Sequence, residues 1–311
     1  MTRDRLHLRA SVLRVHNMTF APNKFQAAIT IREEVAGMPL DLESFPIREL
    51  RKGRGMAWDP QAIDFTKDRK DWLALDDEER YFLLSQVIGF LVGERAVTHD
   101  LAPLQQTLRM ERGRIAEEMY ITQQTYEESV HVEFFERWTQ EVLPGVLGKD
   151  IPYPEGEGMF FSHVLPDAMQ ALNSDRSPEA QMRATVTYHQ VVEGVLAEVG
   201  YRLFYLCLDE RGIFPGLREG VRNIQVDESR HIAFGTYFAQ RLISEHPELE
   251  AVFIAEMERL HGITIQSNQQ MPDRYGDTMP FGIESAVMNK FTNQFFKQRR
   301  EAVLKGGLIE A

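Results

Sequence analysis

The sequence contains one pair of potential metal ligands twice. The stretches EESVH and DESRH each end in Glu-x-x-His, which places Glu128 with His131 and, 100 residues later, Glu228 with His231. Residues three apart on a helix project to the same side, so each carboxylate and imidazole can converge on one point. Carboxylate and neutral imidazole suit iron, manganese and other borderline divalent ions. The absence of nearby cysteines disfavours structural zinc and iron–sulfur clusters.

Two further carboxylates complete a set for two ions. A dinuclear carboxylate site in a four-helix bundle takes one inward Glu from each helix that lacks the Glu-x-x-His pair. Glu94 interrupts the apolar run FLVGERAVTH, and Glu193 interrupts VTYHQVVEGVLAEV. An unpaired carboxylate there would cost on the order of several kcal/mol, so each needs a partner. The predicted metal ligands are Glu94, Glu128, His131, Glu193, Glu228 and His231.

Other polar residues on these segments have simpler explanations. A single Glu-x-x-His on a helix is common and usually has no function, whereas two copies with single apolar-flanked Glu residues elsewhere are far more specific. His99, His163 and His189 are expected to be ordinary polar residues near the core. Glu198 is a weaker ligand candidate than Glu193, because it lies further from the most apolar stretch.

Long segments with helical patterns are expected to position these residues. The first begins at an N-cap near Asp76 and is predicted to end near Leu101, before Pro103. A Pro/Gly-rich loop at 142–158 precedes a short apolar segment, 159–172, that we expect to be helical with a bend at proline. The predicted long helices span about 76–101, 111–143, 177–212 and 217–246, followed by 248–270 and 283–305.

The pattern predicts an all-α protein built on a helical bundle. No segment alternates convincingly as a strand does, and no short repeat or low-complexity tract is present. With 43% hydrophobic residues in 311, the chain can bury a substantial core. We predict a single domain over 1–311, with the metal-binding bundle at about 76–245 and an N-terminal extension, 1–50, of uncertain structure.

The composition limits the kinds of partner that the protein can bind and the cellular compartment that suits it. A net charge of −12 argues against nucleic acid as the main partner, since phosphate binding needs clustered Lys and Arg. The single cysteine, Cys207, excludes an intramolecular disulfide framework and suits a reducing compartment. The longest uncharged apolar run, 81–93, is well short of the roughly 20 residues of a transmembrane helix. A soluble, cytoplasmic protein is expected, and peripheral membrane association is left open.

The motifs resemble a known group of proteins over about residues 55–245. The chain is similar to the ferritin-like superfamily and, within it, to the small subunit of ribonucleotide reductase. It is most similar to the ligand-binding oxidases that share that subunit's fold but not its reaction. This resemblance implies a ferritin-like four-helix bundle with accessory helices. It rests on the stretches AWDPQAIDF, GERAVTHD, EEMYITQQTYEESVH, TYHQVVEG and VDESRHIAFG, in this order.

Three positions bear on the choice between oxidase and reductase subunit. Phe135 stands where reductase subunits usually carry a radical-bearing tyrosine, four residues after the first metal histidine. Phenylalanine there is shared by the oxidases and by a manganese/iron class of reductase subunits. In the oxidases, a valine and a tyrosine at the positions of Val97 and Tyr188 are joined by an ether bond that the metal site makes. Both residue types are present here, which favours the oxidase.

The resemblance implies a dioxygen-activating enzyme that oxidises an unactivated C–H bond by two electrons. Its centre would be manganese/iron, with di-iron as an alternative. Glu94, Glu128 and His131 would hold manganese, with Glu128 able to bridge. A long-chain fatty acid in an apolar tunnel and a homodimer are also implied. Iron would be held by Glu193, Glu228 and His231.

Three more residues match positions near the site in related proteins. They are Tyr201, Trp58 and Asp227. Asp227 could orient a metal-bound histidine through its free ring nitrogen, whereas Trp58 is equally well explained as core packing. Two other functions stay open from the sequence. One is a manganese/iron-class reductase small subunit, which needs a large catalytic partner, and the other is a non-catalytic iron store or lipid-binding protein.

Overall fold

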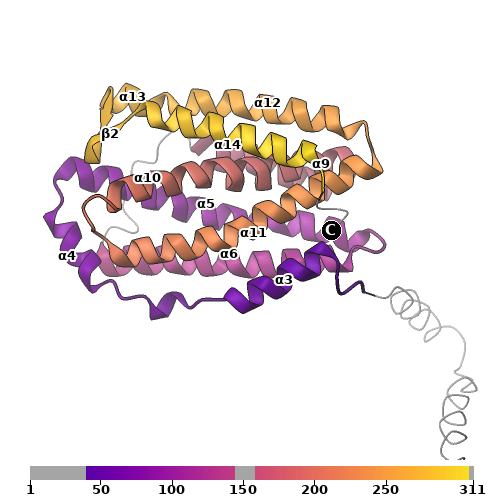
Figure 1. Ribbon diagram of the computed structural model, residues 1–311, viewed down its shortest axis with the longest axis horizontal. Coiled ribbons are helices and arrows are strands. Elements are labelled where there is room, and N and C mark those ends of the chain that lie inside the picture. Colours follow the sequence, from indigo (N-terminus) through magenta and orange to yellow (C-terminus); the bar gives the residue numbers. More distant parts are fainter. Residues whose placement is uncertain (1–39, 144–157, 308–311) are drawn as a thin grey trace, which may run out of the picture. The chain divides into compact units, whose positions relative to one another are not determined.

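The computed structural model describes residues 40–143 and 158–307, and from Leu42 onward these residues form one compact unit. Most of the predicted N-terminal extension and the loop at 144–157 lie outside the described residues. Within the described ranges, no helix is long and apolar enough to cross a membrane. The described chain is almost entirely helical (Figure 1), as the sequence predicts.

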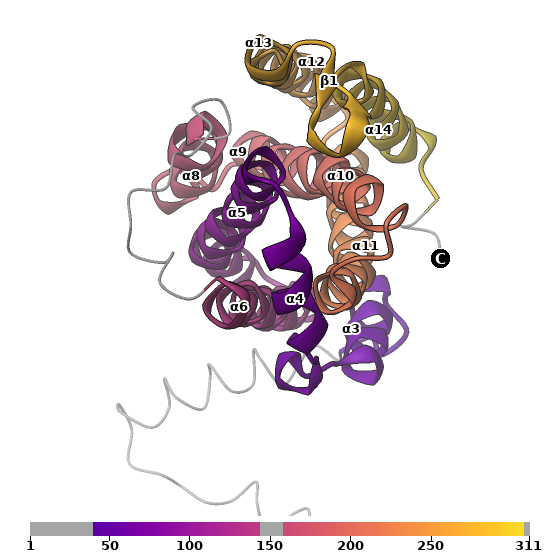
Figure 2. The same ribbon diagram turned by 90° about the vertical axis from the view of Figure 1, so that its left-hand side faces the viewer.

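Four long helical segments surround a common centre (Figure 2). The third is continuous but changes its hydrogen-bonding pattern twice, from α-helix to π-helix and back. The predicted second and fourth helices are confirmed to within a few residues. The segments are α5 (Asp77–Met110), α6 (Ile115–Val142), the run α9 (Pro178–Thr185), η4 (Val186–Ala197) and α10 (Glu198–Leu208), and α11 (Pro215–Glu245).

The sequence predicts the start of helix α5 correctly but not its end. Its start is confirmed, because Asp76 accepts a hydrogen bond from the backbone N–H of Glu79 in a capping box. The predicted end near Leu101 is wrong, since the helix continues through Pro103 to Met110. A proline inside a helix costs about 3 kcal/mol. The turns beyond it bury Leu104 and Leu108 completely, and that packing offsets the cost.

The segment η4 is a π-helix of 12 residues in the middle of the third long segment. Its valines, Val186, Val191, Val192 and Val195, are all buried, so neighbouring helices enclose it. The wider turn changes which residues share a face, compared with a regular α-helix. Because η4 carries Glu193, its geometry sets where that carboxylate lies.

Asp68 fixes the start of α11. This buried carboxylate, on α4 (Thr66–Ala74), accepts hydrogen bonds from the backbone N–H groups of Gly216 at 2.9 Å and Leu217 at 2.7 Å. It also accepts one from the indole N–H of Trp138 on α6, at 2.9 Å. A carboxylate at a helix N-terminus satisfies unpaired backbone donors there. The contact therefore ties α11 to α6, the two helices with the Glu-x-x-His pairs.

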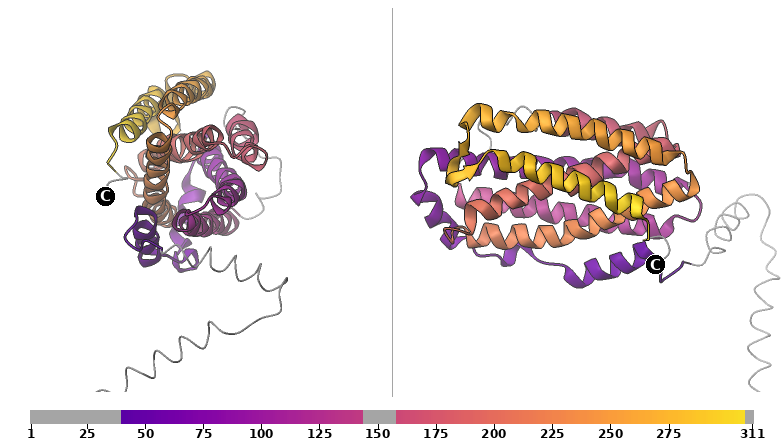
Figure 3. Two further views of the ribbon diagram at one scale, coloured as in Figure 1. Left: turned by 90° about the vertical axis from the view of Figure 1, so that its right-hand side faces the viewer. Right: turned by 45° about the horizontal axis from the view of Figure 1, so that its top comes forward.

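Accessory elements cover the bundle (Figures 1 and 3). Helix α3 contains Phe45, which stacks on Tyr237 of α11 at 5.0 Å, so the end of the predicted extension packs on the bundle. The predicted short helical segment is confirmed, but the absence of strands is not, since β1 and β2 pair antiparallel. These elements are α3 (Phe45–Met56), η1 (Pro60–Ala62), η2 (Phe160–Val164), α8 (Leu165–Gln170), η3 (Ala171–Asn173), α12 (Leu249–Asn268), α13 (Gln270–Tyr275), β1 (Thr278–Met279), η5 (Pro280–Gly282), β2 (Ile283–Glu284) and α14 (Ala286–Lys305).

Candidate metal centre

The six predicted ligands meet at the centre of the bundle. Each comes from the helix on which the sequence placed it: Glu94 from α5, one Glu-x-x-His pair from α6, Glu193 from η4 and the other pair from α11. Their ligand atoms form two groups, and within each group the atoms lie within 4.8 Å of one another. The groups are Glu94, Glu128, His131 and Glu228, and Glu128, Glu193, Glu228 and His231.

Two carboxylates belong to both groups. Oxygens of Glu128 lie 3.2 Å from Nδ1 of His131 and 3.2 Å from Nδ1 of His231. The two oxygens of Glu228 lie 3.7 Å from the same two nitrogens. Each of these residues can therefore bridge two ions. The resemblance had implied a bridging role for Glu128 only, so the shared position of Glu228 is new.

The donor set fits two divalent cations. All six side chains are buried, and Nδ1 of both His131 and His231 has no hydrogen-bond partner. One oxygen each of Glu128, Glu193 and Glu228 is also without a partner. Buried polar atoms are normally paired, so a cluster of unpaired ligand atoms fits a site that binds ions. Two divalent ions would neutralise the four carboxylates.

Without metals, the carboxyl groups cannot all carry charge. Burial raises the pKa of Glu94 to about 8. Burial, together with the negative charge of Glu228, raises the pKa of Glu193 well above its usual range. Burial alone would raise the pKa of Glu128, but the neighbouring charge of His231 and the two imidazoles beside the carboxylate outweigh burial and lower the pKa. Bound cations reverse this pattern, because they favour the ionised form of every carboxylate.

Each histidine is oriented by an acidic residue from the opposite helix. Nε2 of His131 lies 3.3 Å from Oδ2 of Asp227, as the sequence predicts for that aspartate. Nε2 of His231 lies 2.8 Å from Oε2 of Glu127. These contacts leave Nδ1 of both rings free to face the ions. Glu127 was not predicted, although the acidic residue that opens both EESVH and DESRH is a signal for it.

Arg230 and Trp58 support the two orienting acids. The guanidinium of Arg230 donates to Oε1 of Glu127 at 2.7 Å and to Oδ1 of Asp227 at 2.6 Å. The indole of Trp58 donates to Oδ2 of Asp227 at 2.8 Å, so Trp58 does more than fill the core. Burial opposes the charge of Asp227, but the hydrogen bond from His131 lowers its pKa to about 2.

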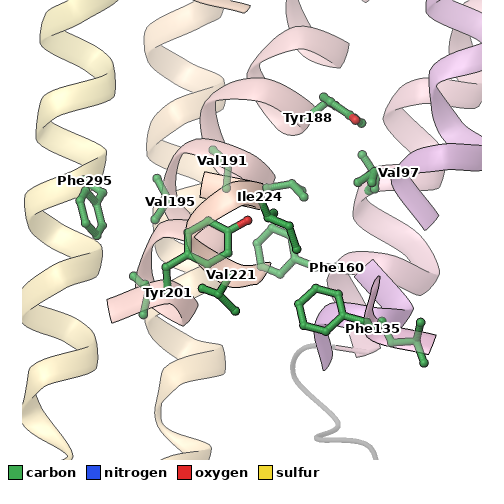
Figure 4. Packing of buried hydrophobic residues seen from close by; sticks show 14 of the residues in the cluster. Val97, Phe135, Phe160, Tyr188, Val191, Val195, Tyr201, Val221, Ile224 and Phe295 are labelled. Carbon is green, nitrogen blue, oxygen red and sulfur yellow. The ribbon is translucent and has the colours of Figure 1, made fainter. Parts of the chain in front are cut away.

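Tyr188 directly contacts one of the predicted ligands. Its hydroxyl donates to Oε1 of Glu128 at 3.0 Å, and Gln124 donates to Oε1 of Glu193 at 2.9 Å. Gln124 was missed by sequence reasoning. In Figure 4 the Tyr188 hydroxyl is turned toward the side of the interior on which Val97 lies. Val97 and Tyr188 are both buried, at 5% and 0% exposure.

A cavity opens beside the metal ligands. Glu94, Glu193 and Glu228 form part of its wall, and Val97 lies on the same wall. Much of the remaining surface is apolar and includes Phe160, which Figure 4 shows in the interior. Tyr201 lies close by, because its ring stacks at 5.1 Å on Phe90, another wall residue. The carboxylates therefore face an apolar space.

The weaker candidates lie outside both ligand groups. His99 and His163 are exposed, so the expectation that they lie near the core is wrong. His189 is buried, but its Nδ1 lies 3.0 Å from the hydroxyl of Thr185, and burial lowers its pKa to about 3. Glu198 is hydrogen-bonded by Gln225 at 3.3 Å. The ranking of ligand candidates made from the sequence is thus in accord with the geometry.

Fold and site together define a ferritin-like protein with a dinuclear carboxylate–histidine centre. Residues 50–296 match the family model described as "Ribonucleotide reductase, small chain". The chain belongs to this family, and within it to the R2-like ligand-binding oxidases.

Solved structures of R2-like ligand-binding oxidases support this placement. One with an aerobically reconstituted Mn/Fe cofactor is 32% identical, with a TM-score of 0.80. The match covers 87% of this chain and 96% of that one. The oxidase from Sulfolobus acidocaldarius is 33% identical, with a TM-score of 0.76 and coverage of 86% and 92%.

Proposed function

We propose that this protein is an oxidoreductase that activates dioxygen at a manganese/iron centre and oxidises an unactivated C–H bond by two electrons. The observation that carries the proposal is the closed set of four buried carboxylates and two imidazoles beside an apolar cavity. The ions would supply the redox chemistry and open coordination positions. The protein would supply fixed ligands, two oriented histidines and a space from which water is excluded.

The two ions would occupy different ligand groups. Manganese would be held by Glu94, Glu128 and His131, and iron by the group that contains Glu193 and His231, with Glu228 shared. The related oxidases with a reconstituted Mn/Fe cofactor support this choice of metals. Both groups offer the same ligand types, so their chemistry alone does not distinguish the two ions.

The substrate or ligand would be a long-chain fatty acid or a similar apolar molecule. Its carboxylate would bind at the metals, where Glu94, Glu193 and Glu228 line the cavity, and its chain would lie along the apolar wall. The related ligand-binding oxidases support a bound ligand in this fold. Extraction of the purified protein and mass spectrometry of the extract would identify the bound class. Recovery of polar metabolites alone would contradict it.

The centre would also join Val97 to Tyr188 by an ether bond. Variants of the related oxidase carry substitutions at a glycine and a valine four positions apart, and at two tyrosines thirteen positions apart. Gly93 and Val97 have the first spacing here, and Tyr188 and Tyr201 have the second. The hydroxyl of Tyr188 already contacts the ligand Glu128, so the oxidising centre is adjacent to the bond that must break.

The role of a manganese/iron-class reductase small subunit is the second candidate activity, because the matching family model is that of the reductase small chain. Phe135, fully buried four residues after His131, is compatible with both. A pull-down with a reductase large subunit and a nucleotide-reduction assay would separate them. We also propose a cytoplasmic homodimer. The resemblance supports the dimer and the single buried Cys207 supports a reducing compartment. Sedimentation would measure the oligomeric state.

Anomalous scattering at the manganese and iron edges tests the metal assignment. Crystals of protein loaded with both ions in the absence of dioxygen should show manganese beside Glu94 and His131 and iron beside Glu193 and His231. Iron at both positions would replace the mixed centre by a di-iron one. A single ion, or none, would contradict the dinuclear site. Dioxygen consumption by the loaded protein, with His131→Ala as the inactive control, tests the activity itself.

A further inference from the structure

One face of α5 connects the metal ligands to a second polar position in the cavity. Gln86, Phe90, Glu94 and Val97 all line the cavity and recur every three or four residues, as one face of a helix does. Gln86 precedes Glu94 by eight residues, which places it about 12 Å away along the helix axis. The cavity therefore has a carboxylate end at the ions and an amide well away from them.

Gln86 has an unpaired donor. The side chain is 6% exposed, and its Nε2 atom is buried without a hydrogen-bond partner. A buried N–H group that lacks an acceptor destabilises the protein, and native structures rarely leave one unpaired. A cation cannot accept a hydrogen bond, so bound ions would not satisfy this N–H group, and Gln86 is outside both ligand groups. Gln86 is itself part of the cavity wall.

The same region of the cavity carries further polar side chains. Asn268 and Gln270, at the junction of α12 and α13, line it together with Gln86. Helix α5 packs near this junction, because Phe82, one turn before Gln86, contacts Tyr275 of α13 at 5.8 Å between ring centroids. Nδ2 of Asn268 is held by Thr292 and Asn289 at 2.9 Å each. The N–H group of Asn268 is thus paired, whereas the Nε2 group of Gln86 has no partner within the protein.

We infer that Gln86 binds a second oxygen acceptor on the ligand. The cavity then selects an apolar chain that carries a hydroxyl, carbonyl or carboxylate oxygen roughly ten carbons from the group bound at the metals, the length that spans the rise from Glu94 to Gln86. A plain hydrocarbon chain would fill the same space but leave the amide unpaired. The inference rests on the proposed function, because it needs the acid group at the ions.

Calorimetric titration with two matched acids tests this selectivity. The protein, loaded with Mn(II) and Fe(II) without dioxygen, is titrated with decanoic acid and with 10-hydroxydecanoic acid. The hydroxyl preference is the ratio of their two dissociation constants. Gln86→Met keeps the length of the side chain and removes the donor, so the preference should fall on the order of three- to tenfold. Gln106→Met, at an exposed position of α5 outside the cavity, should leave it unchanged.

The outcomes separate this inference from the proposed function. An unchanged preference in Gln86→Met would overturn the inference and would mean that the amide serves only a buried water. If decanoic acid binds metal-free and loaded protein equally well, the acid is not at the ions. The proposed position of the ligand is then wrong, and the spacing between its acid group and Gln86 no longer applies. If neither acid binds the loaded protein, both the Gln86 inference and the proposed function are overturned. A six-carbon pair, too short to reach Gln86, should show no dependence on that residue.

Discussion

Glu127 of α6 accepts a hydrogen bond from Nε2 of His231 on α11, across 2.8 Å. The contact is the counterpart of the one between Asp227 of α11 and His131 of α6. Each helix therefore supplies one predicted metal-binding pair and also the acid that orients the other helix's imidazole. Arg230 bridges the two acids, so the arrangement couples the two halves of the centre.

Glu127→Gln should weaken metal binding without abolishing it. The amide keeps the size of the side chain but loses the charge that holds the His231 ring, and loss of such a partner typically costs 10- to 100-fold in metal affinity, roughly. Competition with a fluorescent chelator would measure the change. Glu133→Gln, at an exposed position of the same helix, is the matched control. Equal affinities in the two variants would exclude an orienting role for Glu127.

Removing a direct ligand should have a larger effect. Glu128→Ala takes away a carboxylate shared by both ligand groups, and His131→Ala removes an imidazole, so each should reduce the content from two ions per chain to one or none. Metal analysis after aerobic loading would measure it. His99→Ala should retain both ions, because His99 is exposed on α5. Two ions per chain in both ligand variants would contradict the assignment.

The metal-free protein should lose stability as the pH rises from 6.5 to 8.5. Burial raises the folded-state pKa of Glu94 from 4.5 to about 8, so its charge must be buried in this window. Between pH 4.5 and about 8 the folded state therefore binds more protons at Glu94 than the unfolded state, so stability falls as the pH rises toward 8.

Urea unfolding midpoints at the two pH values would measure this effect. The loaded protein is the control, because bound cations keep the carboxylates ionised throughout and should remove most of the pH dependence. A metal-free midpoint that stays constant, or rises, across the window would show that the buried carboxyl groups do not titrate in this way.

Gly235→Ala should destabilise the bundle near the centre. A β-carbon at Gly235 would lie 2.1 Å from Cβ of His189, so α11 and η4 would have to move apart. Such overpacking typically costs about 1–3 kcal/mol. Gly262→Ala in α12 is the control. No atom lies within 4 Å of its new β-carbon, so this substitution should raise the stability instead of lowering it. It should stabilise the helix by about 0.5–1 kcal/mol. Thermal unfolding of both variants would decide.

Helical spacing alone was sufficient to predict that Glu128 lies beside His131 and Glu228 beside His231. The sequence did not predict the contacts that depend on how the helices pack against one another. The bridging position of Glu228 and the contacts of Gln124 depend on how the helices approach. The π-helical turns of η4 and the continuation of α5 beyond Pro103 are likewise stabilised by buried neighbours that no local pattern reveals.

The ether bond between Val97 and Tyr188 should form when the loaded centre meets dioxygen. Exposure of metal-free protein to Fe(II), Mn(II) and air should remove one hydrogen from the Val97 Cβ and one from the Tyr188 hydroxyl. The chain should therefore lose about 2 Da. Reduction of dioxygen to two waters takes four electrons, two from the divalent ions and two from these side chains. The side chains release two of the four protons, and solvent supplies the others.

Tryptic mass spectrometry would find the Val97 and Tyr188 peptides linked after aerobic loading and separate after anaerobic loading. Tyr188→Phe should prevent the link but keep both ions, because the Tyr188 hydroxyl contacts Glu128 and is not itself in either ligand group. Phe135→Leu, a change in the buried core that leaves both cross-linking residues in place, should still form the link. Separate peptides in fully loaded, air-exposed wild type would remove the most specific support for the oxidase and favour the reductase subunit.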